Sequence, residues 1–238
     1  MPGLDGTGKL FEPITPYLEN HFSLNVIQYE DQDSLEELVE LVESQLPSDE
    51  PVSLVAESFS SPIAIEVLAR NNFKFAASVL STGFCRPPYD FVSPLVRLVP
   101  DKLFGIEVLS KIALEIFGIE KGTDDELGQE CMDALSTVSP STIKRRMEIV
   151  GDVNLCNSLS KIEIPILYIR ASRDRIIPKG KSDEVVSKLV NAEEVIVEGP
   201  HLILQSNPKA CADHIIRHMT SNERMQSDLK TATPFFGA

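Results

Sequence analysis

Ser58, Asp174 and His201 are the residue types that together can activate a hydroxyl group, because a histidine takes the serine proton while a carboxylate orients the imidazole ring. Each of the three falls just past the carboxyl end of a short apolar segment with the pattern of a buried strand. The carboxyl ends of parallel strands meet at one edge of a sheet, where ligand chemistry collects in open α/β folds. We therefore expect the three side chains to lie together at that edge.

Ser58 stands where the apolar run 52–57 gives way to an apolar pattern of helical period. This change of period predicts a sharp strand-to-helix turn, which is the geometry of a nucleophile elbow. The usual elbow has glycine two residues before and two residues after the serine, whereas Ala56 and Ser60 occupy these positions here. Other interpretations stay open: Ser58 could cap the following helix, Asp174 could be a turn residue, and His201 could be an ordinary loop histidine.

Gly3, Gly6 and Gly8 make the first residues a glycine-rich loop. Glycines leave backbone N–H groups without side-chain cover, which suits binding of an anion or an oxyanion. A phosphate-binding loop is the weaker interpretation, because the spacing matches neither common nucleotide-binding motif and no strand precedes the loop.

Five segments have the apolar pattern of strands, and helices with short connections separate most of them. The helix over 35–46 is predicted to begin at a capping box formed by Ser34 and Glu37. Strands that alternate with helices predict right-handed crossovers and a mostly parallel sheet, so the expected class is α/β. The five predicted strands are 23–29, 52–57, 75–81, 164–170 and 194–198.

Residues 86–163 lack the strand pattern and predict a helical insertion, or cap, between two strands. We expect one helix at 102–117 and another that begins at Ser139 and Pro140, a serine cap followed by proline in the first turn. The α/β core would then consist of 1–85 and 164–220, and 221–238 would form a loosely ordered polar tail. The apolar residues of the cap could pack on the sheet, line an apolar substrate pocket, or do both.

The composition excludes several classes of protein. A net charge of −14 and a pI near 4.7 oppose binding to nucleic acids and to anionic membrane surfaces, and no apolar run is long enough to span a membrane. Four widely separated cysteines without metal-ligand spacing indicate reduced thiols in a cytoplasmic protein. His214 and His218 lie one helical turn apart, but no third metal ligand is evident, so no metal site is expected.

Apart from the polar tail, nearly the whole chain resembles the α/β-hydrolase family, and within it the small bacterial serine hydrolases with a helical cap. That group includes carboxylesterases and pimeloyl carrier-protein methyl ester esterases. The resemblance implies that Ser58 is the nucleophile, that His201 is the general base and that Asp174 orients the imidazole. It also implies an oxyanion hole formed by the backbone N–H groups of Leu4 and Phe59. The segments that carry the resemblance are Pro2-Gly3-Leu4-Asp5-Gly6, Ala56-Glu57-Ser58-Phe59-Ser60, Ser172-Arg173-Asp174-Arg175-Ile176-Ile177-Pro178 and Gly199-Pro200-His201.

The expected function is that of a serine hydrolase that cleaves small-molecule carboxylic esters of small or medium apolar acyl groups through an acyl-enzyme intermediate, without a cofactor. Two kinds of alternative remain. The same fold could support amide or peptide cleavage, acyl transfer or a cofactor-free peroxidase reaction, or the protein could bind a small apolar ligand without catalysis. The sequence does not indicate an oligomeric state.

The start of the chain departs from this family, whose members place an apolar strand directly before the Pro-Gly loop, whereas here the loop begins at Met1. We expect that the chain is truncated at its N-terminus. Without that strand, neighbouring strands would lose backbone partners, so the chain would be marginally stable until an upstream apolar segment is added.

Overall fold

The computed structural model describes residues 1–89, 96–98 and 125–231, and these residues form an α/β structure with a four-stranded parallel sheet. The strands lie in the order in which they occur along the chain, and each crossover contains at least one helix. This arrangement confirms the expected fold class. The strands are β1 (Val52–Glu57), β2 (Phe75–Ser81), β3 (Ile166–Ala171) and β4 (Ala192–Val197).

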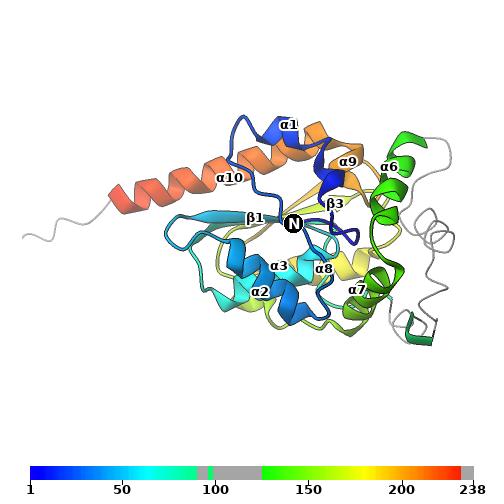
Figure 1. Ribbon diagram of the computed structural model, residues 1–238. Helices are drawn as coiled ribbons and strands as arrows, with labels where there is room; N and C mark the ends of the chain where they lie inside the picture. The colour runs from blue at the N-terminus through cyan, green and yellow to red at the C-terminus, as the bar shows by residue number, and fades with distance from the viewer. Residues whose placement is uncertain (90–95, 99–124, 232–238) are drawn as a thin grey trace, which may run out of the picture.

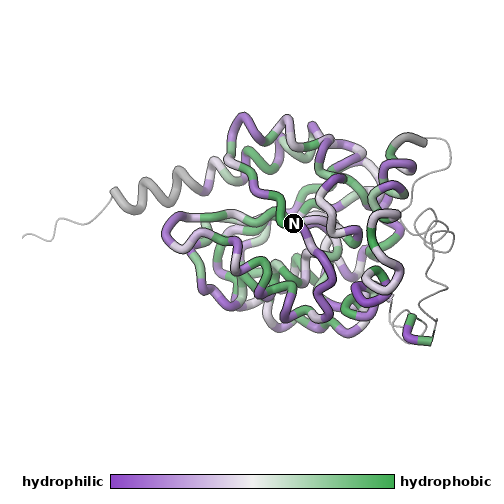
Figure 2. Tube along the Cα trace, in the orientation of Figure 1, coloured by the Kyte–Doolittle hydropathy of each residue, from purple (hydrophilic) through white to green (hydrophobic). Residues whose placement is uncertain are grey.

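Helices cover both faces of the sheet (Figure 1). One apolar cluster joins a face of the sheet to α2, α3 and α8, and a second cluster joins the opposite face to α1, α9 and α10. Every residue of β2 and β3 is buried, as expected for parallel strands covered on both faces. Figure 2 shows hydrophobic stretches in the interior of the molecule and hydrophilic ones mainly at its periphery. The helices are α1 (Thr15–Leu18), α2 (Leu35–Gln45), α3 (Ser60–Arg70), α8 (Lys179–Lys188), α9 (Ile203–Ser206) and α10 (Pro208–Thr231).

Two helices of the predicted insertion, α6 (Asp125–Ser136) and α7 (Pro140–Asp152), lie beside the carboxyl edge of the sheet (Figure 1). Their apolar side chains pack against Leu10 of the short helix η1 (Lys9–Phe11) and against Leu202. A short helix η3 (Leu159–Lys161) follows them. The helix expected at 102–117 lies outside the described residues.

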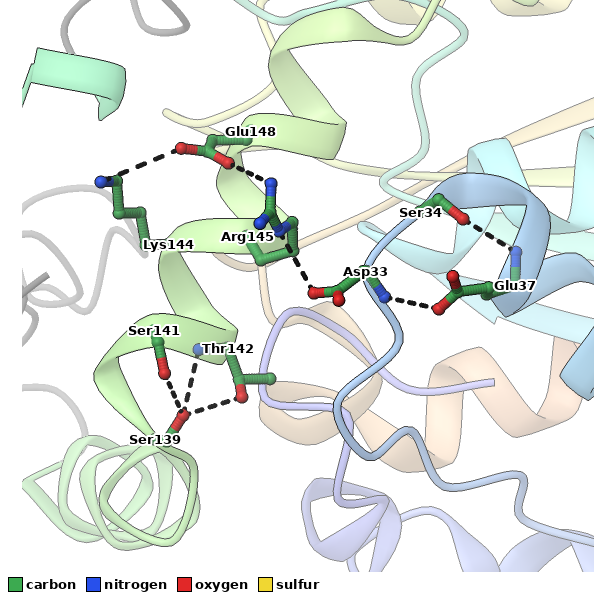
Figure 3. Close-up of polar contacts among 9 residues, drawn as sticks. All are labelled: Asp33, Ser34, Glu37, Ser139, Ser141, Thr142, Lys144, Arg145 and Glu148. Atoms are coloured by element: carbon green, nitrogen blue, oxygen red, sulfur yellow. Dashed lines mark hydrogen bonds and ion pairs between the residues drawn. The ribbon is translucent and has the colours of Figure 1, made fainter.

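The two predicted helix starts are confirmed by their caps. The Ser34 side chain accepts a hydrogen bond from the Glu37 amide, and the Ser139 side chain accepts one from the Thr142 amide (Figure 3). Such caps satisfy amides that have no partner within the helix. At the other end of the chain, α10 continues to Thr231, so the first part of the segment expected to be a loose tail is helical.

The strand expected at 23–29 is wrong, because the structure assigns no strand there. A strand needs a backbone neighbour, and Met1 occupies the position beside the end of β1: its amino group donates to the Val55 carbonyl at 2.9 Å, and the Glu57 amide donates to the Met1 carbonyl at 3.2 Å. Segment 23–29 is held instead through the Tyr29 amide, which donates to the Gly6 carbonyl at 2.8 Å. Leu24 of this segment remains 42% exposed.

The expectation that the cysteines are reduced thiols is wrong for two of the four. Cys85, in the loop after β2, forms a disulfide with Cys156 at the end of the insertion, with 5.0 Å between their Cα atoms. Seventy-one positions separate the two residues, so their meeting depends on how the insertion returns to the core. Cys131 and Cys211 are buried free thiols, and burial raises the pKa of each to about 12. None of the helices in the described ranges has the length and apolar character needed to cross a membrane.

Replacing both Cys85 and Cys156 with serine should lower the free energy of unfolding by about 2–5 kcal/mol, because the disulfide restricts the unfolded chain across a long loop. Urea unfolding under non-reducing conditions measures this loss. Wild-type protein treated with dithiothreitol should unfold at the urea midpoint of the double variant. If reduction leaves the wild-type midpoint unchanged, the disulfide does not stabilise the fold.

Candidate active site

Ser58 lies between β1 and α3 with its backbone in the left-handed region, at φ 46°. A non-glycine residue adopts this conformation only where the surroundings hold it there. The Ser58 amide donates to the Ser81 carbonyl at the end of the neighbouring strand, and its carbonyl accepts from the Ser61 amide in the first turn of α3, each at 2.9 Å. These two bonds fix the sharp turn that the sequence predicts.

Ala56 and Ser60, the small residues on either side of the turn, are both fully buried. Larger side chains would separate the strand from the helix, which is the reason that elbows favour glycine here. Ser60 also does what glycine cannot, because its hydroxyl donates to the Pro2 carbonyl and contacts the Tyr29 hydroxyl, each at 2.5 Å. Serine at this position therefore links the elbow to the glycine-rich loop.

The structure brings the three candidate side chains into one hydrogen-bonded chain. His201 Nε2 lies 2.8 Å from Ser58 Oγ, and His201 Nδ1 lies 2.9 Å from Asp174 Oδ2. The histidine side chain is fully buried and that of Asp174 is 6% exposed. The other carboxylate oxygen of Asp174 accepts from the amides of Ile176 and Ile177 at 2.8 and 2.9 Å, so the carboxylate is held by its own loop.

The loops after β3 and β4, which carry Asp174 and His201, are bound to each other. The Arg173 amide donates to the Gly199 carbonyl at 2.9 Å, and the Gly199 amide donates to the Ser172 hydroxyl at 3.3 Å. Gly199 has φ 154°, and a Cβ atom there would lie 2.5 Å from Ile203 Cδ1. Glycine is therefore required for this close approach, which keeps the aspartate beside the histidine.

Leu4, the first predicted oxyanion residue, lines the same cavity as Ser58 and His201. It belongs to a tight turn in which the Gly6 amide donates to the Gly3 carbonyl at 3.1 Å. Phe59, the second predicted oxyanion residue, follows Ser58 directly, is buried, and has its ring edge-on to that of Tyr29. The structure thus places both residues next to the nucleophile candidate.

The cavity beside Ser58 measures about 10 Å³, which is room for about one water molecule. Its apolar lining comes from the glycine-rich loop, from η1 and from Cys131 and Leu135 of α6, while the polar lining includes Asp5 and Glu57.

Glu57 is a site residue that the sequence reasoning did not identify. It directly precedes Ser58, is 1% exposed, and accepts a hydrogen bond from Gln205 Nε2 at 3.1 Å on one carboxylate oxygen. The other oxygen, Oε1, is buried without a hydrogen-bond partner among the described residues. Burial raises the pKa of Glu57 to about 7, with Asp5 adding to the effect and Gln205 and His201 opposing it. The sequence signal that could have identified Glu57 is a charged residue at the end of an otherwise mostly apolar strand, directly before Ser58.

A metal site finds little support in the described residues. The described residues include a group of side chains close enough together to bind one metal ion, namely Cys85, Cys156 and Glu184. Its two cysteines are joined in the disulfide and offer no thiolate. His214 lies 2.8 Å from Arg217, and His218 lies 3.2 Å from Glu193, so the two histidines have separate partners.

Glu57→Gln should change how stability depends on pH. Below about pH 4.5 the Glu57 carboxyl is protonated in both the folded and the unfolded protein. Between about pH 4.5 and pH 7 the folded protein keeps the proton that the unfolded chain has lost. The free energy of unfolding of the wild type therefore falls as the pH rises through this range. The free energy of unfolding of the variant minus that of the wild type should therefore increase by roughly 3 kcal/mol from pH 4 to pH 8. Urea unfolding across this range tests it, with the exposed Glu50→Gln as control. A difference that does not change with pH would show that Glu57 ionises as it does in the unfolded chain.

No family model and no curated protein matches this sequence. Solved structures do match its fold. An esterase from Thermogutta terrifontis has a TM-score of 0.80 at 12% identity, covering 91% of this chain and 86% of the esterase. MenH from S. aureus has a TM-score of 0.79 at 14% identity, and the match covers 93% of this chain and 92% of MenH. The enol-lactonase from Burkholderia xenovorans LB400 has a TM-score of 0.76 at 14% identity, and the match covers 92% of this chain and 88% of the lactonase. With a parallel sheet between helical layers and these structural neighbours, the chain has the α/β-hydrolase fold.

Proposed function

We propose that this protein is a serine hydrolase that cleaves carboxylic esters through an acyl-enzyme on Ser58. The observation that carries the proposal is the hydrogen-bonded chain Ser58–His201–Asp174, with 2.8 and 2.9 Å between the paired atoms. Ser58 Oγ attacks the ester carbonyl while its proton passes to His201 Nε2, and the imidazolium is stabilised by Asp174. The C–O bond then breaks, and the leaving alcohol takes the proton from His201.

Deacylation repeats these steps with water in place of serine. His201 Nε2 takes a proton from the water, the hydroxide attacks the acyl carbonyl, and Ser58 Oγ leaves with the proton that His201 returns. In both halves the carbonyl oxygen becomes negative and needs donors. We assign this role to the N–H groups of Leu4 and Phe59, aided by the positive end of the α3 dipole.

The cavity beside Ser58 supports a proposal for the substrate class. The cavity is narrow and its lining is mainly apolar, with the carboxyl groups of Asp5 and Glu57 beside it, which supports small, uncharged acyl groups over long or anionic ones. Amide or peptide cleavage, acyl transfer and a cofactor-free peroxidase reaction are the competing activities for the same side chains. The first two would use the same acyl-enzyme and differ in the leaving group or in the final acceptor.

Ser58→Ala should lower kcat for p-nitrophenyl butyrate by at least about 10⁴-fold, and Asp174→Asn by about 10⁴-fold, because each removes a member of one catalytic unit. The matched control is Ser61→Ala, which removes a buried hydroxyl three residues away that has no hydrogen-bond partner among the described residues, and which should keep the rate. Mass spectrometry should find the adduct of a fluorophosphonate on Ser58 in wild type. Full turnover by Ser58→Ala would refute the assignment of the nucleophile.

Leu135→Ala should shift the preference toward longer acyl chains, because Leu135 lines the cavity beside Ser58. Each buried methylene group is worth about 0.8 kcal/mol, so room for about two more of them should raise the ratio of kcat/KM for hexanoate to that for acetate roughly tenfold. A series of p-nitrophenyl esters from acetate to octanoate measures this ratio. Met132→Ala, on the same helix but outside the cavity lining, should leave the ratio unchanged. An identical chain-length profile in all three proteins would exclude a pocket beneath α6.

A further inference from the structure

Arg146 is a buried cation that connects the cap to the loop beside Ser58. It lies on α7, is 1% exposed, and within the described residues donates four hydrogen bonds, all to backbone carbonyls. Nη1 donates to the carbonyls of Leu4 and Asp5 at 2.9 and 2.6 Å, and Nη2 donates to those of Tyr29 and Glu30 at 3.1 and 2.7 Å. One side chain therefore holds two chain segments together.

The hydrogen bonds of Arg146 do not include a carboxylate among the described residues. Removing a guanidinium from water is unfavourable, and burial lowers its pKa despite the nearby charge of Asp5. The four carbonyl dipoles and the ring of Tyr29, whose centroid lies 6.0 Å from Cζ, are what offset this penalty. A neutral side chain could fill the same space without the penalty, so the charge points to a purpose other than packing.

The two loop carbonyls bound by Arg146 belong to the middle of the turn that presents Leu4. The Gly3 carbonyl and the Leu4 N–H are parts of one planar peptide group, and the Gly6 amide fixes that carbonyl. Arg146 fixes the carbonyls of the next two residues, so the direction of the Leu4 N–H is set from both sides. Gly6 has φ 69°, and a Cβ atom there would lie 2.5 Å from Arg146 Nη1, so glycine is what lets the guanidinium come this close.

Tyr29 extends the same network to the elbow. Its carbonyl accepts from Arg146, its amide donates to the Gly6 carbonyl, and its hydroxyl contacts Ser60, which in turn donates to the Pro2 carbonyl. The loop is thus bound before, within and after the turn. Arg146 itself does not line the cavity beside Ser58, so it cannot act by touching a substrate there.

We propose that Arg146 is a positioning residue for the oxyanion hole: by binding the carbonyls of Leu4 and Asp5, it holds the Leu4 N–H toward the oxygen that becomes negative. This rests on the proposed function, in which Leu4 supplies one of the two donors. An interaction made only in the transition state changes kcat and leaves KM nearly unchanged. Arg146 should therefore control the rate of the chemical step and not the binding of the ester.

The test compares Arg146→Lys and Arg146→Met with Arg145→Gln. Arg145 is the next residue on α7, but its side chain is 48% exposed and pairs with Asp33 and Glu148, away from the loop (Figure 3). A lysine keeps the charge but cannot bind four carbonyls as a planar fork does. Loss of one oxyanion donor lowers kcat by about 10²–10³-fold, so we expect this loss in both Arg146 variants, with KM for p-nitrophenyl butyrate within about threefold of wild type and Arg145→Gln fully active.

Hydrogen exchange of the Gly6 and Tyr29 amides supplies a readout that needs no turnover. Both amides should exchange at least about tenfold faster in the Arg146 variants, and at wild-type rates in Arg145→Gln and Ser58→Ala. If the amides respond but wild-type protein neither hydrolyses esters nor reacts with a fluorophosphonate, the proposed function fails while the anchoring of the loop stands.

The proposal is overturned if a folded Arg146 variant keeps wild-type kcat, if KM rises while kcat is unchanged, or if the two amides exchange as in wild type. Should neither Arg146 variant fold, Gly6→Ala disturbs the same contact from the loop side and should show the same loss of kcat. If all three variants are unfolded by circular dichroism, Arg146 is needed for folding and the positioning role is wrong.

Discussion

The left-handed backbone of Ser58 is the constraint on which the rest of the site depends. At φ 46° the chain reverses direction within one residue, so the hydroxyl projects from the carboxyl edge of the sheet while α3 begins behind it. The conformation is unfavourable for serine by itself and persists because the amide and carbonyl of Ser58 are both bonded to neighbouring elements. Small, buried Ala56 and Ser60 follow from the same constraint, as does the position in which His201 meets the hydroxyl.

In the described structure, hydrogen bonds to its own backbone carbonyls hold the glycine-rich loop in place. Within the described residues, β1 is paired along one side with β2, while its other side meets Met1 at its carboxyl end. The loop that follows Met1 is secured by a side chain of α7, by Tyr29 and by Ser60. Such a loop depends on side chains from distant parts of the chain, so its geometry is sensitive to how the cap packs on the core.

Glu57 and Arg146 are buried ionisable groups that lie beside this loop. Glu57 is buried beside Ser58 with one oxygen lacking a partner, and burial favours its neutral form. Arg146 is buried on the cap side, where carbonyl dipoles compensate its charge. In the proposed reaction, a neutral Glu57 carboxyl would avoid placing a second negative charge beside the oxyanion, whereas the Arg146 charge would stabilise the loop that binds it.

Much of the fold was predictable from the sequence, because local patterns encode it. The change of period at Ser58, the serine caps at Ser34 and Ser139, and the apolar runs before Asp174 and His201 each depend on nearby residues. The order of the three candidate residues along the chain then placed them at one sheet edge, and the structure joins them by hydrogen bonds.

The remaining features depend on contacts between residues far apart in the sequence, and only the tertiary structure decided them. Residues 23–29 alternate as a strand does, but the pattern does not reveal whether a neighbouring strand is there to pair with them, and in the described structure they form no strand. The spacing of Cys85 and Cys156 likewise does not reveal that the fold brings the two residues together. The raised pKa of Glu57 comes from burial. Arg146 gave no signal at all, because its partners are backbone carbonyls, which every residue carries whatever its side chain, so that only the folded positions of α7 and the loop determine the contact.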